Sequence, residues 1–415
     1  MVDRVPDDVL RWRDPKRHLW LLALVVPTLP FQAGALAGLT GLRAFWWWGP
    51  FFAFVLLPAV DHFTGPDRAN PPEEVMRRLE ADTYYRWCTY LYLPLQFGAL
   101  VFACGVWARG TMTVVDCLGL TATTGVVAGV AINTAHELGH KRERLERRLS
   151  RMALAQSCYG HFYVEHNHGH HIRVATPEDP ASSRMGEGFW RFLPRAVLGS
   201  ARSAWSLEQR RLSRRGRRTW SRHNDILTAW ALSVALFGAL VAAFGWTVLP
   251  YLILQAVLGF CLLETVNYLE HYGLSRQRRP DGRYERVSPR HSWNSNNTIS
   301  NLLLFQLQRH SDHHAHPLRR YQTLRHFDEA PQLPSGYATM IVLAWFPPLW
   351  RRVMDSRLLT HYEGDASRAN LHPAARGRLT EPHRGPASPG SASTAHAARA
   401  TRSGAASSPG EGNSM

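Results

Sequence analysis

Histidine is the residue type whose spacing most clearly indicates chemistry in this sequence, because it recurs in four short clusters. The clusters are His-Glu-Leu-Gly-His-Lys at 136–141, Glu-His-Asn-His-Gly-His-His at 165–171, Asn-Tyr-Leu-Glu-His-Tyr-Gly at 267–273 and Leu-Gln-Arg-His-Ser-Asp-His-His at 307–314. Residues four apart share one face of a helix, so His136 and His140 can bind one metal ion. His166 and His170 are also four apart, with His171 adjacent.

A single pair of this kind is common on a helix surface, and a lone histidine such as His271 more often hydrogen-bonds than binds a metal. Four clusters rich in neighbouring carboxylates indicate a metal site instead. Carboxylates beside ligands can orient imidazole rings or accept their second N–H. The candidates for this role are Glu137, Glu165, Glu270 and Asp312.

The number of histidines predicts two metal ions. Imidazole binds zinc, copper, iron and nickel, and a zinc ion is satisfied by three or four protein ligands. The four clusters hold more histidines than one such ion can use. The five cysteines are scattered without a Cys-x-x-Cys pair, so the sequence supports neither a disulfide framework nor a cysteine-bound metal. Plentiful nitrogen ligands favour iron in oxygen chemistry.

A zinc metalloprotease is an alternative, because His136 and His140 also fit His-Glu-x-x-His. In that case Glu137 would be the general base that activates a zinc-bound water. The other clustered histidines argue against this alternative. Metal content separates the two hypotheses, since one predicts a single zinc and the other two irons.

The elements that must position these clusters are predicted to be membrane helices. Uncharged runs cover residues 19–42, 44–60, 87–108, 117–135 and 226–263. A membrane-spanning helix needs about 20 apolar residues, so the first four runs each fit one span. The last run is too long for one span and has Gly245 near its middle, which indicates a helical hairpin. The predicted fold is therefore an all-α, polytopic membrane protein with six transmembrane helices.

The distribution of positive charge predicts the orientation of these spans. Five Lys and Arg residues precede the first span, four lie between the second and third, and eighteen lie within 136–225, whereas the alternate loops hold one, one and none. The positive-inside rule then places both termini and all large loops in the cytoplasm, below the cytoplasmic (inner) membrane. The fourth and sixth spans both end there, so all four clusters can meet in a cytoplasmic helical cap.

The formal net charge of +16 has three interpretations. Nucleic-acid binding is one, with arginines of the 210–218 segment as candidates, but the spans argue against it. We expect these arginines to face anionic lipid headgroups instead. The third interpretation is a docking surface for an acidic electron carrier.

The chain divides into three predicted parts. Residues 1–18 form a cytoplasmic N-terminal segment, and residues 19–365 form the six-span domain. An apolar stretch, 341–350, is expected to rest on the membrane surface or on the catalytic domain. Residues 366–415 are rich in Ala, Ser, Gly, Pro and Arg, which predicts a disordered tail.

The four clusters together resemble the histidine boxes of the membrane-bound di-iron oxygenases, which include fatty-acid desaturases and hydroxylases. Within that group they are most similar to the alkane 1-monooxygenase family. The 267–273 cluster discriminates, because desaturases generally lack it. Further similar stretches are Ala-Thr-Pro-Glu-Asp-Pro at 175–180 and Ser-Trp-Asn-Ser-Asn at 292–296. The resemblance covers roughly residues 15 to 360.

The resemblance implies two iron ions with nine histidine ligands. The implied ligands are His136, His140, His166, His170, His171, His271, His310, His313 and His314. Four further histidines lie near the clusters but outside the matching positions: His161, His168, His291 and His316.

The resemblance also implies the reaction and its partners. Dioxygen and two electrons would convert medium- or long-chain n-alkanes to 1-alkanols, with the electrons supplied by a rubredoxin and its reductase. No cysteine follows Cys261, so we expect a separate rubredoxin, docked on residues 210–218. An alkane has no polar handle and requires an apolar channel within the spans, entered from the bilayer. Trp46, Trp47 and Trp48 either line that channel or form an interfacial aromatic belt.

Two further alternatives stay open. One is a related di-iron enzyme, namely an aryl-methyl monooxygenase, a fatty-acyl ω-hydroxylase or a desaturase. The other is a non-catalytic metal-binding or transport protein, which would need ionisable groups along the membrane interior. Only Asp116 and Glu264 lie near span edges.

Overall fold

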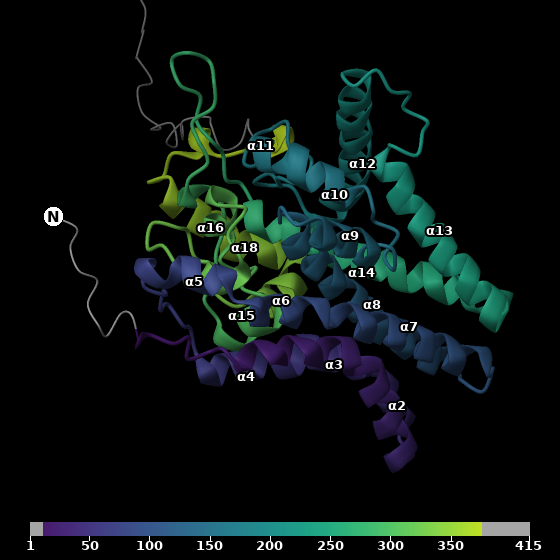
Figure 1. Ribbon diagram of the computed structural model, residues 1–415. Helices are drawn as coiled ribbons and strands as arrows, with labels where there is room; N and C mark the ends of the chain where they lie inside the picture. The colour runs from purple at the N-terminus through teal and green to yellow at the C-terminus, as the bar shows by residue number, and fades with distance from the viewer. Residues whose placement is uncertain (1–10, 376–415) are drawn as a thin grey trace, which may run out of the picture. The chain divides into compact units, whose positions relative to one another are not determined.

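The computed structural model describes residues 11–375, and every regular element within that part of the chain is a helix (Figure 1). The only β-type pairings in the described range are isolated bridges. The predicted all-α fold is confirmed. Of the predicted N-terminal segment, residues 1–10 lie outside the described range.

Within the described residues 11–375, six helices are long and apolar enough to cross a membrane, which confirms the predicted number of spans. They are Leu19–Thr40, Arg43–Thr64, Thr83–Ala108, Val114–Gly139, Asp225–Phe244 and Trp246–His271. Gly245 separates the last two and has φ +85°, a conformation that favours glycine. The hairpin predicted around this residue is therefore present.

The first two spans change helix type along their length. The first consists of the 3₁₀-helix η1 (Leu19–Thr28) and α2 (Leu29–Thr40). The second consists of η2 (Arg43–Trp47), α3 (Trp48–Phe51), the π-helix η3 (Phe52–Leu56) and α4 (Leu57–Thr64). Proline has no N–H to donate to the preceding turn. Pro27, Pro30 and Pro58 lie at or next to these changes of helix type.

The fourth and sixth spans pack closely against each other and carry the first and third histidine clusters. α8 (Val114–Gly139) begins with a capping box formed by Thr113 and Asp116, and α14 (Leu249–His271) follows η6 (Trp246–Val248). A Cβ on Gly259 would lie 2.7 Å from the Cβ of Ala128. Small residues at this contact let the two backbones approach, which holds the ends of both helices at one place.

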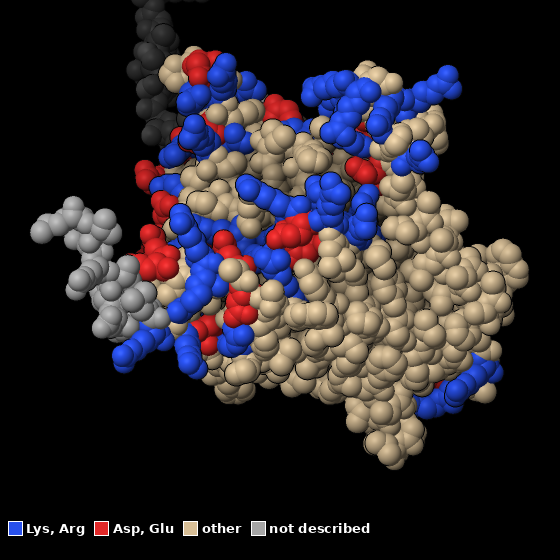
Figure 2. Space-filling view, viewed as in Figure 1, with Lys and Arg blue, Asp and Glu red and all other residues tan. Residues whose placement is uncertain are grey.

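The remaining spans and the cap complete the described part. The spans are α6 (Thr83–Tyr90) with α7 (Tyr92–Ala108), and α13 (Asp225–Phe244). The cap contains η4 (Glu73–Val75), α5 (Met76–Ala81), α9 (Arg144–Ala153), α10 (Phe162–Glu165), η5 (His166–His170), α11 (His171–Arg173), α12 (Phe189–Ser213), η7 (Pro289–His291), α15 (Thr298–Leu303), α16 (His310–Ala315), η8 (Tyr321–Thr323), α17 (Tyr337–Ala344), α18 (Pro347–His361) and η9 (Ala366–Arg368). Charged side chains gather over the cap, whereas the spans are largely free of them in this view (Figure 2).

The apolar stretch at 341–350 rests on the helical domain. Its Trp350 is fully buried, and the indole ring lies 5.1 Å from the ring of Tyr268 and 5.3 Å from that of Tyr272. Tyr268 lies in the last turn of the sixth span, and Tyr272 is the residue that follows this span. The 341–350 stretch therefore packs against the third histidine cluster, residues 267–273.

Residues 366–375 pack on the helical domain, although the tail was predicted to begin at Ala366. The N–H of Met185 donates to the carbonyl of Asn370 (2.8 Å), and the N–H of Asn370 donates to the carbonyl of Gly273 (2.9 Å). Leu371 is buried in the core. The change in composition at Ala366 concealed these backbone bonds and this apolar anchor. The rest of the predicted tail, 376–415, lies outside the described residues.

Candidate metal centre

The structure brings nine histidines from four separate segments into two neighbouring groups. The first group is His136, His140, His166, His171 and His313, and the second is His170, His271, His310 and His314. Within each group the nitrogens that could bind an ion lie within 4.8 Å of one another. These are the nine histidines expected to be ligands, and ligand binding itself remains a prediction.

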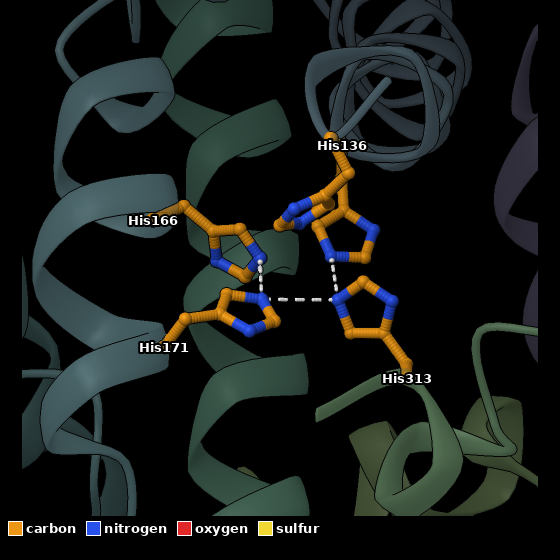
Figure 3. A group of neighbouring side chains, drawn as sticks. His136, His166, His171 and His313 are labelled. Carbon is orange, nitrogen blue, oxygen red and sulfur yellow. Dashed lines mark hydrogen bonds between the residues drawn. The ribbon is translucent and has the colours of Figure 1, made fainter. Parts of the chain in front are cut away.

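In the first group the imidazole nitrogens face a common centre (Figure 3). The Nε2 atom of His313 lies 2.9 Å from Nε2 of His136 and 3.1 Å from Nε2 of His171. Nε2 of His166 lies 3.0 Å from Nε2 of His171. Two imidazoles that bind one ion at about 2.1 Å and at right angles have their nitrogens about 3.0 Å apart. The observed spacings are those of nitrogens that share an ion.

The second group has the same arrangement with four rings. Nε2 of His310 lies 2.9 Å from Nε2 of His314 and 3.3 Å from Nε2 of His271. The ring of His170 lies 4.9 Å from those of His271 and His314. Its Nε2 atom is buried and has no hydrogen-bond partner in the described structure, so that nitrogen fits a metal ligand.

The second cluster divides between the two groups because it forms a π-helix, η5. An α-helix would place His166 and His170, which are four apart, on one face. The wider π turn instead brings residues five apart onto one face. His166 consequently lies with His171 in the first group, and His170 faces the second. His136 and His140, which are also four apart but lie at the end of an α-helix, are together in the first group.

Of the four carboxylates expected beside the ligands, Glu270 contacts a grouped histidine. Its Oε2 atom lies 3.1 Å from Nε2 of His310, and its Oε1 atom accepts a hydrogen bond from the Tyr337 hydroxyl (2.9 Å). The carboxylate of Glu270 is therefore at the ion-facing side of the second group.

The other three carboxylates hold the surrounding backbone and cations. Glu137 pairs with Lys141 (3.0 Å), and Asp312 accepts two hydrogen bonds from Arg319 (2.7 and 2.9 Å). The Glu165 carboxylate accepts from Arg173 (2.7 Å). Burial raises the pKa of Glu165 to about 7. These contacts support the cap from one residue away from the histidines.

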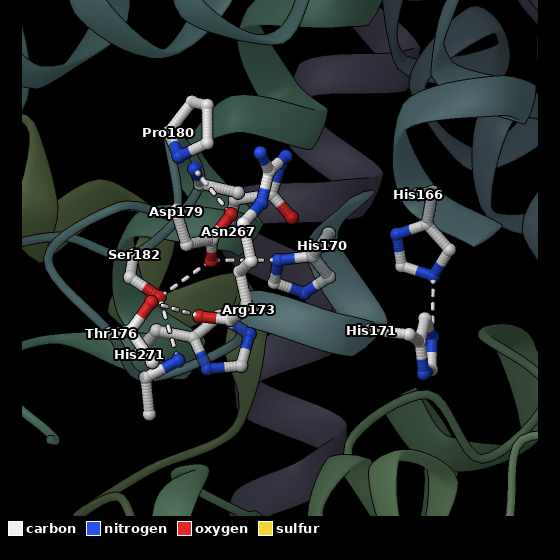
Figure 4. A network of polar contacts seen from close by, with 12 residues as sticks. His166, His170, His171, Arg173, Thr176, Asp179, Pro180, Ser182, Asn267 and His271 are labelled. Carbon is white, nitrogen blue, oxygen red and sulfur yellow. Dashed lines mark hydrogen bonds and ion pairs between the residues drawn. The ribbon is translucent and has the colours of Figure 1, made fainter. Parts of the chain in front are cut away.

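Asp179 is a functional candidate that the sequence argument did not single out (Figure 4). It is buried and accepts a hydrogen bond from Nδ1 of His170 (2.9 Å) and another from the Ser182 hydroxyl (2.6 Å). Burial alone would raise the pKa of Asp179, but His170 and Ser182 together hold it below its usual value. The stretch 175–180, already noted for its resemblance, contained the signal that could have identified it.

The four histidines outside the matching positions also lie outside both groups. His291 contacts Glu285 (3.1 Å) and His316 contacts Asp312 (2.9 Å). His161 is buried, and His168 is exposed.

Burial keeps six of the grouped imidazoles neutral. It lowers the pKa of all those outside the spans for which a shift is resolved to well below the ordinary value; these are His140, His166, His171, His310, His313 and His314. A neutral imidazole has a lone pair for a metal ion. Buried nitrogens without a hydrogen-bond partner, on His140 and His170, fit the same explanation. The residues present therefore fit two metal ions.

An apolar cavity of about 90 Å³ lies between α8, α14, α17 and the second span. Its lining includes Phe54, Val130 and Val266. Asn133, one turn before His136, and Tyr337, whose hydroxyl bonds Glu270, line it as well. The cavity is thus adjacent to the histidine groups.

The three consecutive tryptophans are not part of this lining. A Cβ on Gly119, near the opposite end of α8, would lie 2.7 Å from the Trp47 ring. Trp48 donates to Gln32 (2.9 Å). The hypothesis that these tryptophans line the cavity is not supported, and the aromatic belt remains the prediction.

Within residues 11–375, six apolar helices and two histidine groups held between the span ends and the cap define a multi-pass membrane protein with a histidine-rich metal site. The sequence model of the fatty acid desaturase family matches residues 114–344. The alkane 1-monooxygenase of Acinetobacter baylyi is 46% identical over 375 residues, which cover 89% of this chain and 91% of that protein. The alkane 1-monooxygenase 1 of Alcanivorax borkumensis is 45% identical over 88% of this chain and 90% of its own length.

A xylene/toluene monooxygenase hydroxylase component of Pseudomonas putida is 29% identical over 67% of this chain and 75% of its own length. The chain belongs to the alkane 1-monooxygenase family. The resemblance found in the histidine clusters is thereby confirmed, and the protein is an oxygenase.

Proposed function

We propose that this protein hydroxylates the terminal methyl group of medium- or long-chain n-alkanes to give 1-alkanols. The observation that carries the proposal is the apolar cavity between the spans, which adjoins the two histidine groups through Asn133 and Tyr337. The names and similarity of the relatives support the same substrate class.

The proposed cofactor is a pair of iron ions. The nine grouped histidines would hold them, five at one ion and four at the other. When bound, the iron pair supplies the activation of dioxygen with two electrons, chemistry that no side chain provides. An all-imidazole first group and an imidazole set with one adjacent carboxylate, Glu270, suit iron and leave sulfur ligands out.

The remaining residues of the site bind, orient and exclude water. Side chains such as Phe54, Val130 and Val266 offer only apolar surface to a hydrocarbon, so burial of the chain itself provides the binding energy. The Tyr337 hydroxyl holds the Glu270 carboxylate in place. Asp179 fixes the His170 ring through Nδ1, which leaves Nε2 directed into the second group.

The proposed location is the cytoplasmic (inner) membrane, with both termini in the cytoplasm. The large Arg-rich segments support this orientation, and membrane lipids then surround the spans and can deliver the alkane. The proposed electron donors are a separate rubredoxin and its reductase. The proposed docking site for the rubredoxin includes residues 210–218.

Product analysis under ¹⁸O₂ tests the proposal. Cells that express the chain with a rubredoxin and its reductase would receive n-alkanes of graded length. Labelled 1-alkanol is the expected product, and the yield profile reports the depth of the cavity. Absence of product from every alkane, with two irons bound and reduced, would contradict the proposal. One zinc in place of two irons would favour a metalloprotease.

Aryl-methyl hydroxylation is a second candidate, because the xylene/toluene monooxygenase component is also similar. Adding toluene and p-xylene to the same assay distinguishes the two. A labelled benzylic alcohol as the main product would show that the substrate is an aryl-methyl compound. Faster formation of 1-alkanol would support the alkane as the substrate. With a fatty acid as substrate, an ¹⁸O-labelled ω-hydroxy acid would identify an ω-hydroxylase, and an unlabelled unsaturated acid would identify a desaturase.

A further inference from the structure

The metal centre approaches the protein surface at a particular segment, α11 (His171–Arg173). His171 is the one partly exposed member of the nine grouped histidines, and the other eight are buried. The next residue, Ile172, is 67% exposed. An exposed isoleucine therefore lies one residue away from a histidine of the first group, on the cap side of the molecule.

Two further elements hold this segment in place. The Arg276 guanidinium donates through Nη1 to the carbonyl of Ile172 (2.9 Å). The backbone N–H of Arg276 donates to the carbonyl of Ala175 (2.7 Å). The Arg173 guanidinium donates to the Ser203 hydroxyl of α12 (2.6 Å). α11 is thus tied to the 276–286 loop and to α12.

Both of these elements are rich in arginine. The loop contains five arginines against two carboxylates: Arg276, Arg278, Arg279, Arg283 and Arg286. The end of α12 and the following turn add six more: Arg210, Arg211, Arg214, Arg215, Arg217 and Arg218. Figure 2 shows basic side chains on two projections with a hollow between them, where an acidic side chain is also visible, and Figure 1 shows α10 and α11 between the same two projections.

The carboxylates in this region are already engaged. Glu178 pairs with Arg278 (3.5 Å) and Asp281 with Arg279 (2.9 Å). Glu208 and Asp225 both pair with Arg211. Among the described residues, Arg283, Arg286 and the other arginines of 210–218 have no carboxylate partner. The rim therefore carries uncompensated positive charge around the exposed Ile172.

We infer that this hollow, the α11 hollow, is the docking site of the acidic electron carrier. The occupant is a small iron protein with an apolar contact patch inside a ring of carboxylates. Its apolar patch contacts Ile172, and its carboxylates face the two arginine-rich rims. Docking here places the carrier one residue from His171, so the electron path to the first group is short. This inference rests on the proposed function and extends the predicted site beyond residues 210–218.

Each docking event transfers one electron. The carrier's iron is oxidised from ferrous to ferric and the enzyme's centre is reduced by one electron, so a turnover that uses two electrons needs two docking events. Fast exchange of the oxidised carrier is then required. Electrostatic steering supplies fast association, and a small apolar contact allows fast release.

The test measures binding and reduction with a purified rubredoxin and the full-length enzyme in detergent. Test variants are Ile172→Asp at the centre and Arg283→Glu on the loop rim, both at exposed positions. Arg191→Glu is the matched control, because Arg191 is exposed on the same helix, α12, about 18 Å from Ser203 along the axis. Association rates and electron-transfer rates are recorded at low salt and at about 1 M salt.

We expect both test variants to lower the association rate at low salt about tenfold or more, with Arg191→Glu close to wild type. At high salt the loss should shrink for Arg283→Glu and persist for Ile172→Asp, whose effect includes the lost apolar contact. Equal losses in all three variants, or a loss confined to a further variant, Arg214→Glu, would overturn the α11 hollow as the site.

Failure of the proposed function is distinguished by a chemical reductant. Dithionite should support equal 1-alkanol formation by wild type, Ile172→Asp and Arg283→Glu. Wild-type enzyme that makes alkanol with dithionite but binds no rubredoxin would overturn the docking inference and leave the hydroxylase proposal intact. Enzyme that binds rubredoxin and accepts electrons at the hollow without making alkanol would overturn the hydroxylase proposal and leave the docking inference intact.

Discussion

The two histidine groups differ in their surroundings more than in their ligands. The first has five imidazoles and one partly exposed member, His171, next to the exposed Ile172. The second has four buried imidazoles, with Glu270 and Asp179 in contact and Tyr337 between it and the cavity. The first group is therefore nearer to the proposed docking hollow, and the second is linked by Glu270 and Tyr337 to the apolar cavity. Two similar sets of rings thus have different neighbours.

The strongest test of this comparison is removal of one histidine from each group. We expect His310→Ala and His313→Ala each to lower bound iron from two per chain towards one and to reduce hydroxylation more than 100-fold, because each group needs its own donors. Metal analysis and ¹⁸O₂ product assays measure this. His316→Ala is the control, since His316 lies outside both groups. Retention of two irons by His310→Ala would contradict the grouping.

A more selective change is Asp179→Asn, which affects the second group alone. Loss of the carboxylate that holds His170 should lower iron affinity or activity about 10–100-fold. Iron spectroscopy should show one altered and one unaltered ion. Asp281→Asn, in the exposed loop, is the control. An equal disturbance of both ions would mean that the groups do not act separately.

A smaller effect is expected from Tyr337→Phe. The variant removes the hydroxyl that donates to Glu270 and keeps the ring. One lost hydrogen bond to a carboxylate corresponds to about a tenfold decrease in turnover, with iron content unchanged. Comparison of the rate per bound iron in wild type and variant measures it. A loss of iron instead would show that Tyr337 maintains the group rather than the orientation of Glu270.

The cavity can be shortened without touching either group. Val130→Phe adds a ring to the lining, and we expect the preferred alkane to become shorter by several carbons while the rate on that alkane changes only a few-fold. Competition between alkanes of graded length measures the shift. Leu232→Phe, on an exposed position of α13, is the control. An unchanged length profile would place the substrate elsewhere.

The smallest expected effect concerns stability behind the second group. Burial raises the pKa of Asp355, which contacts the Tyr272 hydroxyl (2.8 Å). A carboxyl with a raised folded-state pKa contributes stability that is present at acidic pH and lost as pH rises through that pKa. Asp355→Asn should therefore gain a little stability relative to wild type as pH rises from about 4 to neutral. Melting temperatures of wild type and variant in detergent across this pH range test the prediction. A stability gain of Asp355→Asn that grows as pH falls would contradict it.

Much of the architecture could be predicted because it depends on local composition. Runs of about 20 uncharged residues set the spans, and Gly245 marked the hairpin. The tail boundary at Ala366 could not be predicted, because Asn370 and Leu371 are held by backbone bonds and a core that lie far away in sequence. The 341–350 stretch likewise had two possible partners until Trp350 was seen packed on Tyr268.

For the metal site, the sequence by itself determined the four histidine clusters and that both span ends deliver them to one side, and the resemblance to the family implied which nine histidines are candidates. The division of those histidines was decided by tertiary structure, since the π-turn at 166–170 separates His166 from His170. The contact of Asp179 with His170 and the exposure of Ile172 were decided in the same way. Spacing along a chain reports which residues share a face of a regular helix. Which face meets which partner depends on packing between elements far apart in sequence, and no local pattern contains that information.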